Sequence, residues 1–343
     1  MSVQEKINGV YHRLKDDLSR SVFENRVLYS LTNDYRFIKR IIFEQMGQIP
    51  TGLKENKGNI IVYGAGDWGR KVIRILDDYN VTAFCDKDAE KQRVPFSGYD
   101  VISPQELKEK HSESFVVLAV EKYREPYNAL IDMGFSDERI WIYPFIIRDH
   151  EYFEPEIVST VDSEIFIDAG CFNCETSFEF AKQCNYQYDK IIAFEPSPGQ
   201  YAFCLEQTGK IRNMKVHPYA LWNEETEVQF DVNPVTPGYS CIMQPGEEEI
   251  HNNVKVKTAI LDDMLAGEKA TFIKMDIEGA ELNALKGAEQ TICKYHPKLA
   301  ICVYHKPEDI WEIPAYILSL CDDYKLYIRH YNAWYTGTVL YAV

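Results

Sequence analysis

Two stretches decide the fold: Ile165-Phe-Ile-Asp-Ala-Gly-Cys-Phe-Asn-Cys-Glu-Thr176 and, further along, Ile191-Ile-Ala-Phe-Glu-Pro196. In each, a short apolar run ends in an acid, and in the first a glycine and a polar helix start follow. This order is typical of a strand, a tight turn, a helix and a parallel strand, with a ligand at the carboxyl ends of both strands. We therefore predict an α/β fold with a ligand site at this edge of a parallel sheet.

The residues at this edge indicate the kind of ligand. Gly170 allows the backbone to approach a ligand closely, and Glu195 is placed to bind two ribose hydroxyls. A dinucleotide site would instead carry several glycines to cradle a pyrophosphate. Asp168 precedes the glycine and suits a ligand with a positively charged amine. The expected cofactor is S-adenosylmethionine (SAM).

A third block, Thr271-Phe-Ile-Lys-Met-Asp-Ile-Glu-Gly-Ala-Glu-Leu-Asn-Ala-Leu-Lys-Gly-Ala288, makes a family resemblance specific. It is similar to the signature of the FkbM-type methyltransferases, close to F-I-K-hydrophobic-D-hydrophobic-E-G-A-E followed by L-K-G-A. The Asp-Ala-Gly turn, the Ala-Phe-Glu-Pro strand end, Leu261-Asp-Asp263 and Pro297-Lys-Leu-Ala300 also follow in family order. The resemblance covers residues 160–343 and implies a class I SAM-methyltransferase (Rossmann-like) domain.

The cofactor residues expected in this domain come from the strand ends and the resemblance together. They are Asp168, Gly170, Cys171, Phe172, Thr176, Glu195, Pro196, Ala220 and Leu221. The third strand, expected over residues 216–222, should end beside the adenine ring. Gly170 could instead be a turn residue only, and Thr176 a helix-capping hydroxyl.

Cys174 departs from the family pattern, which usually has a glycine there. Cysteine is small enough for a close helix approach but takes a positive φ less easily than glycine. Cys171 and Cys174 form a Cys-x-x-Cys pair, which is either redox-active, half of a metal site, or two small residues in a turn. We favour small residues, and we predict no metal ligands because no second Cys or His pair stands at zinc spacing.

Three residues are expected to carry the chemistry: Asp276, Glu278 and His305. Alternation places Asp276 and Glu278 on one side of the chain, where an acid could take the acceptor's proton or hold a divalent ion. Alternatively, Glu278 is a first-turn acid favoured by the helix dipole. His305 follows a strand and, with an ordinary pKa near 6.5, is a natural general base or else a hydrogen-bonded loop residue.

A second glycine turn, Gly64-Ala-Gly-Asp-Trp-Gly69, follows the apolar run Ile60–Tyr63 and precedes a helix. Asp86 ends the next strand, as in a dinucleotide-binding fingerprint, so Gly64, Gly66, Gly69 and Asp86 are candidate cofactor residues. This domain is about half the usual dinucleotide fold in length. Three interpretations stay open, namely a nucleotide or nucleotide-sugar site, a scaffold with an empty turn, and an NAD site.

Four parts of the chain are expected. They are a helical segment over residues 1–57, a small Rossmann-like domain over 58–147, a linker over 148–163, and the methyltransferase domain over 164–343. The helices either cap the next domain or form the face of a homo-oligomer. Two strands, Leu326–His330 and Thr338–Val343, predict an antiparallel hairpin that closes the sheet.

Composition excludes some partners. The formal net charge of −16 argues against nucleic acid, whose phosphates need a basic face. No run of eighteen apolar residues predicts a membrane span, and the first residues lack the order of a signal peptide. Nine unpatterned cysteines fit a reducing cytoplasm.

The function expected is a cytoplasmic SAM-dependent O-methyltransferase. The resemblance and the attached domain suggest a sugar hydroxyl as acceptor, on a nucleotide sugar or a glycan precursor of a bacterial surface polysaccharide. The need for a divalent metal is left open. A tyrosine-rich set of aromatic residues (Tyr239, Tyr304, Trp311, Trp334, Tyr335) would suit stacking on a sugar. The alternatives are a non-catalytic nucleotide- or SAM-binding scaffold, and an NAD-linked sugar oxidoreductase that lacks the usual Tyr-x-x-x-Lys pair.

Overall fold

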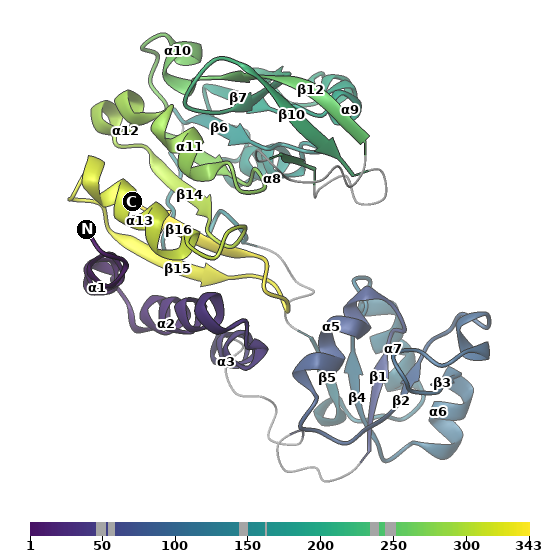
Figure 1. Cartoon of the computed structure of the whole chain (residues 1–343). Helices are drawn as coiled ribbons and strands as arrows, with labels where there is room; N and C mark the ends of the chain where they lie inside the picture. Colours follow the sequence, from purple (N-terminus) through teal and green to yellow (C-terminus); the bar gives the residue numbers. More distant parts are fainter. Residues whose placement is uncertain (46–52, 54–58, 144–149, 162, 234–239, 244–251) are drawn as a thin grey trace. The chain divides into compact units, whose positions relative to one another are not determined.

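The computed structural model describes residues 1–45, 53, 59–143, 150–161, 163–233, 240–243 and 252–343 (Figure 1). The chain divides into two units. Unit 1 comprises Met1–Asn33, His150–His330 and Gly337–Val343, and unit 2 comprises Asp34–Asp149 and Tyr331–Thr336. The expected boundaries at 57/58 and 147/148, and Tyr239, lie outside the described residues. Within the described part, no helix is both long and apolar enough to cross a membrane.

Unit 1 is built on a seven-stranded sheet. Its order is β15 (Leu326–His330), β16 (Thr338–Ala342), β14 (Lys298–Cys302), β13 (Phe272–Met275), β6 (Ile165–Ala169), β7 (Lys190–Phe194) and β8 (Met214–His217). Neighbouring strands are parallel except for the two pairs that β16 makes. The predicted α/β fold with a closing antiparallel hairpin is therefore confirmed. The strand order reverses at β6, and such a reversal opens a crevice at the carboxyl ends of the strands.

Helices flank this sheet. They are α8 (Glu175–Gln183), α9 (Pro198–Thr208), α10 (Leu261–Leu265), α11 (Glu281–Lys286), α12 (Glu289–Tyr295) and α13 (Asp309–Leu320). Aromatic rings fill the centre of the core, where Phe166 of β6 stacks on Phe180 of α8 with centroids 4.2 Å apart. Phe153 packs on both rings and on Phe272. Part of the segment expected as a linker is thus built into unit 1.

The strand expected over residues 216–222 is divided in two. Pro218 has no N–H to donate, so it interrupts the ladder between β8 and β9 (Tyr219–Leu221). β9 joins a second sheet, in the order β11 (Cys241–Ile242), β10 (Glu227–Val232), β12 (Asn252–Ala259), β9. Ala220 consequently lies in a small apolar core with Phe230 and Ala280. The prediction of one strand over residues 216–222 was wrong, and no sequence motif predicted the second sheet.

The N-terminal helices are shared between the units. In unit 1, α1 (Val3–Arg13) and α2 (Asp17–Thr32) lie along α13 and β15 (Figure 1). The guanidinium of Arg329 on β15 binds both carboxylate oxygens of Asp16, at 2.8 and 3.2 Å. In unit 2, α3 (Tyr35–Gln45) buries Ile38, Ile41 and Ile42. The first two helices therefore belong with the C-terminal strands and not with the domain that follows them.

Unit 2 contains a five-stranded parallel sheet. Its order is β3 (Val101–Ile102), β2 (Val81–Cys85), β1 (Ile60–Tyr63), β4 (Phe115–Leu118) and β5 (Ile140–Ile142). Its other helices are α5 (Asp67–Ile75), α6 (Pro104–Lys110) and α7 (Arg124–Asp132), with short 3₁₀ turns at Lys91–Arg93 and Asp137–Arg139. The loop between β15 and β16 contributes Trp334, whose ring lies 4.0 Å from the guanidinium carbon of Arg74.

Candidate active site

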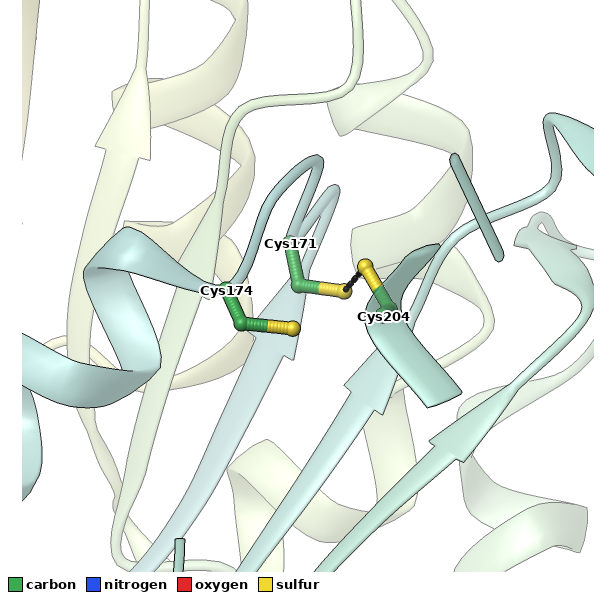
Figure 2. A group of neighbouring side chains, drawn as sticks. All are labelled: Cys171, Cys174 and Cys204. Atoms are coloured by element: carbon green, nitrogen blue, oxygen red, sulfur yellow. Dashed lines mark hydrogen bonds between the residues drawn. The ribbon is translucent and has the colours of Figure 1, made fainter. Parts of the chain in front are cut away.

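The turn after β6 has an unusual backbone. Gly170 has φ +74°, and a Cβ there would lie 2.0 Å from the carbonyl oxygen of Asp276, so only glycine fits. Phe172 (φ +49°) and Cys174 (φ +67°) are also left-handed. Position 174 therefore needs the conformation that glycine takes most easily, and cysteine adopts it at a cost of about 1 kcal/mol. Figure 2 shows the side chain of Cys174 beside those of Cys171 and Cys204.

A cavity opens beside this turn. It encloses about 560 Å³ including space open to solvent. The predicted residues that line it are Gly170, Phe172, Glu195, Pro196, Ala220, Leu221, Asp276 and Glu278. The remaining lining residues are Ala169 and Phe194 at the ends of β6 and β7, Ile277 and Ala280 after β13, and Tyr219, Phe230, Ser240 and Ile242 in or beside the second sheet. No sequence motif identified the last four.

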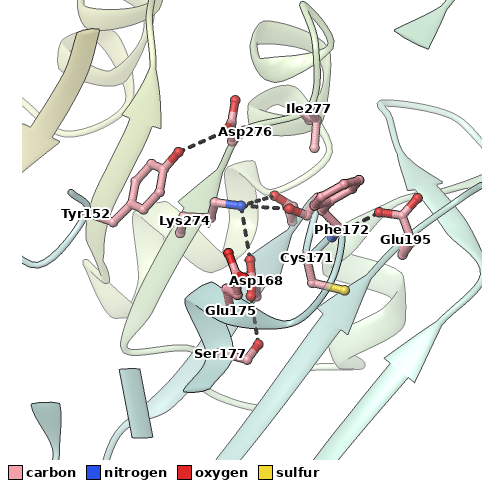
Figure 3. Close-up of polar contacts among 12 residues, drawn as sticks. Tyr152, Asp168, Cys171, Phe172, Glu175, Ser177, Glu195, Lys274, Asp276 and Ile277 are labelled. Carbon is pink, nitrogen blue, oxygen red and sulfur yellow. Dashed lines mark hydrogen bonds and ion pairs between the residues drawn. The ribbon is translucent and has the colours of Figure 1, made fainter. Parts of the chain in front are cut away.

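Glu195 is held at the end of β7. Its carboxylate accepts the backbone N–H groups of Phe172 at 3.0 Å and Ser197 at 2.9 Å. Burial raises the pKa of Glu195 to about 7, although these two N–H groups oppose the rise. The side chain thus ties the turn after β6 to the end of β7, and it lines the cavity (Figure 3).

Asp168 does not line the cavity. It is fully buried, lies 3.1 Å from the ammonium of Lys274, and accepts the hydroxyl of Ser177 at 2.7 Å (Figure 3). This geometry corrects the expectation that Asp168 meets a ligand's amine, because its charge is already neutralised inside the protein. Cys171 is buried against Cys204, and Thr176 is not among the lining residues, so neither faces the cavity either.

The ammonium of Lys274 stabilises the turn after β6, a role that the sequence did not reveal. Its ammonium also donates to the carbonyl oxygens of Gly170 at 2.8 Å and Ala169 at 3.2 Å. Burial by itself would lower the pKa of Lys274, but Asp168 and Asp276 raise it above its ordinary value. The signal in the sequence for this role was a lysine inside an otherwise apolar strand, which needs a buried partner for its charge. Its partner Asp168 lies opposite it in the register of the neighbouring strand.

His305 lies among three carboxylates. Its Nε2 is 3.4 Å from Asp276 and 3.5 Å from Glu278, and its Nδ1 is 2.9 Å from Glu281. Burial by itself would lower the pKa of His305, but these negative charges raise it well above the ordinary value. The role of His305 as general base stays a prediction. A raised pKa disfavours that role, because the protonated imidazole has no free lone pair for a proton.

Asp276 and Glu278 differ in basicity although they share this cation. Asp276 accepts the hydroxyls of Tyr152 at 2.8 Å and Tyr304 at 3.1 Å. Burial would raise the pKa of Asp276, but His305 and Lys274 lower it below its ordinary value. Burial raises the pKa of Glu278, which His305 only partly offsets. Two carboxylates whose pKa values are pushed apart are typical of sites that divide acid–base roles.

The glycine turn of unit 2 is explained partly by packing. A Cβ on Gly64 (φ +118°) would lie 2.5 Å from the carbonyl oxygen of Ala119, and one on Gly69 would lie 2.2 Å from that of Gly64. Gly66 is different, because its backbone is extended and a Cβ there would meet nothing within 4 Å. The protein itself therefore gives no reason for a glycine at position 66.

Asp86 is already engaged by its own domain. Its carboxylate accepts the N–H of Ala65 at 3.0 Å and the ammonium of Lys91 at 2.9 Å. Burial would raise the pKa of Asp86, but these donors and the N–H of Asp88 lower it. A ribose would have to share this carboxylate with Lys91.

Comparisons with known proteins agree with this geometry. Residues 169–332 match the model of the methyltransferase FkbM domain, and residues 56–141 match the model described as C2185-like, N-terminal. The methyltransferase FkbM from Methylobacillus flagellatus KT superposes with a TM-score of 0.51 and 17% identity, over 95% of this chain and 99% of that chain.

Two further solved structures overlap with part of the chain. One is an rRNA methylase from Streptococcus thermophilus, with a TM-score of 0.34 and 14% identity over 55% of this chain and 88% of that chain. The other is a fibrillarin from Aeropyrum pernix in complex with SAM, with a TM-score of 0.34 and 11% identity over 55% of this chain and 70% of that chain. Among curated proteins, none matches.

The seven-stranded sheet with its antiparallel β16 has the topology of the class I methyltransferase fold. The matched FkbM domain makes the protein a methyltransferase, with SAM as its cofactor. The match over residues 169–332 identifies an FkbM-type methyltransferase domain in this chain.

Proposed function

We propose that this enzyme transfers the methyl group of SAM to a hydroxyl of a sugar, on a nucleotide sugar or a glycan precursor of a bacterial surface polysaccharide. The observation that carries the proposal is the pair of carboxylates with divergent pKa values, Asp276 and Glu278, on the wall of the cavity. An unactivated hydroxyl needs a proton acceptor at the reacting atom, and the pair supplies one.

The cofactor is proposed to bind along the carboxyl ends of β6 and β7. The Gly170 turn would receive its methionine part, because Gly170 lines the cavity at the end of β6. Glu195 would accept hydrogen bonds from both ribose hydroxyls, and Ala220 and Leu221 would contact the adenine. All four positions line one cavity, which supports this assignment.

Glu278 is proposed as the proton acceptor and Asp276 as the residue that orients the hydroxyl. Because its pKa is raised, Glu278 is the more basic of the two, whereas Asp276 is stabilised as an anion by two tyrosine hydroxyls. SAM would supply the methyl group: the acceptor oxygen would bond to the methyl carbon as the carbon–sulfur bond breaks, leaving S-adenosylhomocysteine (SAH) and a methyl ether. Glu278 would take the hydroxyl proton. His305 would hold both carboxylates in place as a cation.

The sugar acceptor rests on less direct support. Carboxylates such as Asp276 accept hydrogen bonds from hydroxyls, and Tyr304 lies beside them with its ring 4.0 Å from that of His305. The net charge of −16 disfavours a polyanionic acceptor such as nucleic acid. The family resemblance supplies the rest of the argument.

The test measures transfer of a labelled methyl group from SAM to a panel of glycosides and nucleotide sugars. Glu278→Gln should lower turnover about 10²–10⁴-fold with little change in SAH affinity, and the exposed Glu308→Gln is the matched control. Turnover should rise with pH through a pKa above the ordinary glutamate value. His305→Gln should move that rise to higher pH, because the histidine cation lowers the pKa of Glu278. Wild-type turnover in Glu278→Gln would refute this mechanism, and labelling of amines alone would refute the acceptor class.

A second candidate function concerns unit 2. Gly66 precedes the N-terminus of α5, and its missing side chain leaves space that the protein does not fill, which favours a nucleotide or nucleotide-sugar phosphate there. Gly66→Val should abolish nucleotide-sugar binding without altering SAH affinity. Unchanged calorimetric isotherms with every nucleotide tested would favour the empty scaffold.

The cellular setting is also a proposal. A cytoplasmic location is supported by the nine cysteines, none of which forms a disulfide. Homo-oligomerisation through the N-terminal helices remains a prediction, to be tested by light scattering. Leu28 and Leu31 of α2 are the exposed apolar residues to substitute in that test.

A further inference from the structure

Three cysteine side chains meet behind the turn that lines the cavity. Cys171 and Cys174 lie in the turn, and Cys204 comes from α9. All three are buried, at 2% exposure or less. Their sulfur atoms lie within 4.8 Å of one another, and those of Cys171 and Cys204 are 3.7 Å apart (Figure 2). The Cys-x-x-Cys pair thus has a third partner that its spacing could not reveal.

The spacing of the sulfur atoms suits a metal ion. Zinc–sulfur bonds of about 2.3 Å at tetrahedral angles place two sulfur atoms roughly 3.8 Å apart. The separation between Cys171 and Cys204 already matches this value, so only small shifts are needed to bring all three into coordination. A disulfide needs a separation of about 2 Å, which is a much larger movement in a packed interior.

We propose that Cys171, Cys174 and Cys204 form a three-sulfur binding site for a thiophilic divalent metal ion of the zinc type. The ion would fasten the turn after β6 to α9. Cys204 already contacts this turn, because its thiol donates to the carbonyl oxygen of Phe172 at 3.0 Å. Phe172 in turn donates its N–H to Glu195, so the ion would stabilise the shape of the cavity wall.

The charge of the buried site favours a divalent ion. The thiol protons would leave when the ion binds, because thiolates are the form of cysteine that coordinates a metal. Three thiolates with one divalent ion leave a charge of −1, whereas a monovalent copper ion would leave −2. Burial penalises the larger charge, which favours the divalent ion.

The backbone gives independent support. Cys174 is held at φ +67° with its side chain completely buried, although glycine would relieve the strain. A side chain retained at a strained position is a reason to look for a role beyond packing. Coordination of an ion by its sulfur would supply that role.

The test uses the reduced, chelator-treated full-length chain titrated with Zn²⁺ against a chromophoric chelator, and with Co²⁺ as a spectroscopic probe. We expect one tightly bound ion, release of protons on binding, and a thiolate-to-cobalt absorption band. Cys204→Ser should weaken zinc binding at least about tenfold, which is about 1.4 kcal/mol. Cys174→Gly should weaken it similarly while raising the melting temperature of the metal-free chain.

Cys321→Ser is the matched control, because Cys321 belongs to another group of candidate ligands with His296 and Asp323. It should leave the cobalt spectrum unchanged. Equal zinc affinity in the wild type and in Cys174→Gly, absence of the charge-transfer band, or its loss in Cys321→Ser would each overturn the proposal. Since glycine relieves strain at position 174, a failure of Cys204→Ser to fold would leave Cys174→Gly as the decisive variant.

Discussion

Glu195 offers the sharpest test of where the cofactor binds. Its carboxylate is buried with a pKa of about 7, and it must be ionised to accept two ribose hydroxyls. Hydrogen bonds to a charged group contribute about 1.5–3 kcal/mol each. Loss of both in Glu195→Gln should therefore weaken SAH binding by at least about 3 kcal/mol, or roughly 100-fold in Kd. Isothermal calorimetry measures this, with the exposed Glu206→Gln on α9 as the matched control.

The same residue predicts a pH dependence with a definite sign. A proton on Glu195 competes with the ribose, so affinity should rise as pH rises through 7. For a pKa of about 7, the Kd for SAH should be about tenfold higher at pH 6 than at pH 8. Glu195→Gln carries no titrating group there and should lose this dependence. A Kd independent of pH in the wild type, or wild-type affinity in the variant, would refute the assignment.

Two further predictions concern the framework of the site. Gly170→Ala would place a Cβ 2.0 Å from the carbonyl oxygen of Asp276 at a positive φ, and should lower the free energy of unfolding by about 3 kcal/mol or more and weaken SAH binding. Gly209→Ala, at φ −64° with open space around it, is the control, and an equal loss there would contradict the steric argument. Lys274→Met should cost about 3–5 kcal/mol in urea titrations, because it leaves Asp168 charged and buried. Adding Asp168→Asn should recover part of that loss, and strictly additive losses would show that the two charges do not interact.

The sequence was most informative at the strand ends. Apolar runs ending in an acid, the first with a glycine after it, predicted β6, β7 and the turn after β6. The carboxyl ends of these parallel strands were expected at one edge of the sheet. Glu195 and Gly170 line the cavity as this pattern predicted, and the closing hairpin of β15 and β16 was predicted from two apolar runs. These signals are local, because each depends on residues close together in the sequence and not on the tertiary structure around them.

Predictions based on a residue's chemical type were less reliable. Asp168 had the right position for a ligand contact, but its register partner Lys274 occupies its charge. His305 had the right position for a base, but three carboxylates surround it and raise its pKa. In both cases the neighbours come from segments distant in the chain or from a turn whose shape the sequence does not reveal. A pKa depends on those neighbours and on burial, neither of which is a local property.

The sequence by itself determined the order of strands and helices, the family, and the acids that stand at the strand ends. Only the tertiary structure decided which of those acids face the cavity, that Pro218 redirects the chain into a second sheet, and that Cys204 reaches the cysteine pair. The physical reason is the range of the interactions involved. Hydrophobic periodicity and turn chemistry act over a few residues, whereas a shared proton, an ion pair or a trio of sulfur atoms exists only when the fold brings remote side chains within about 4 Å.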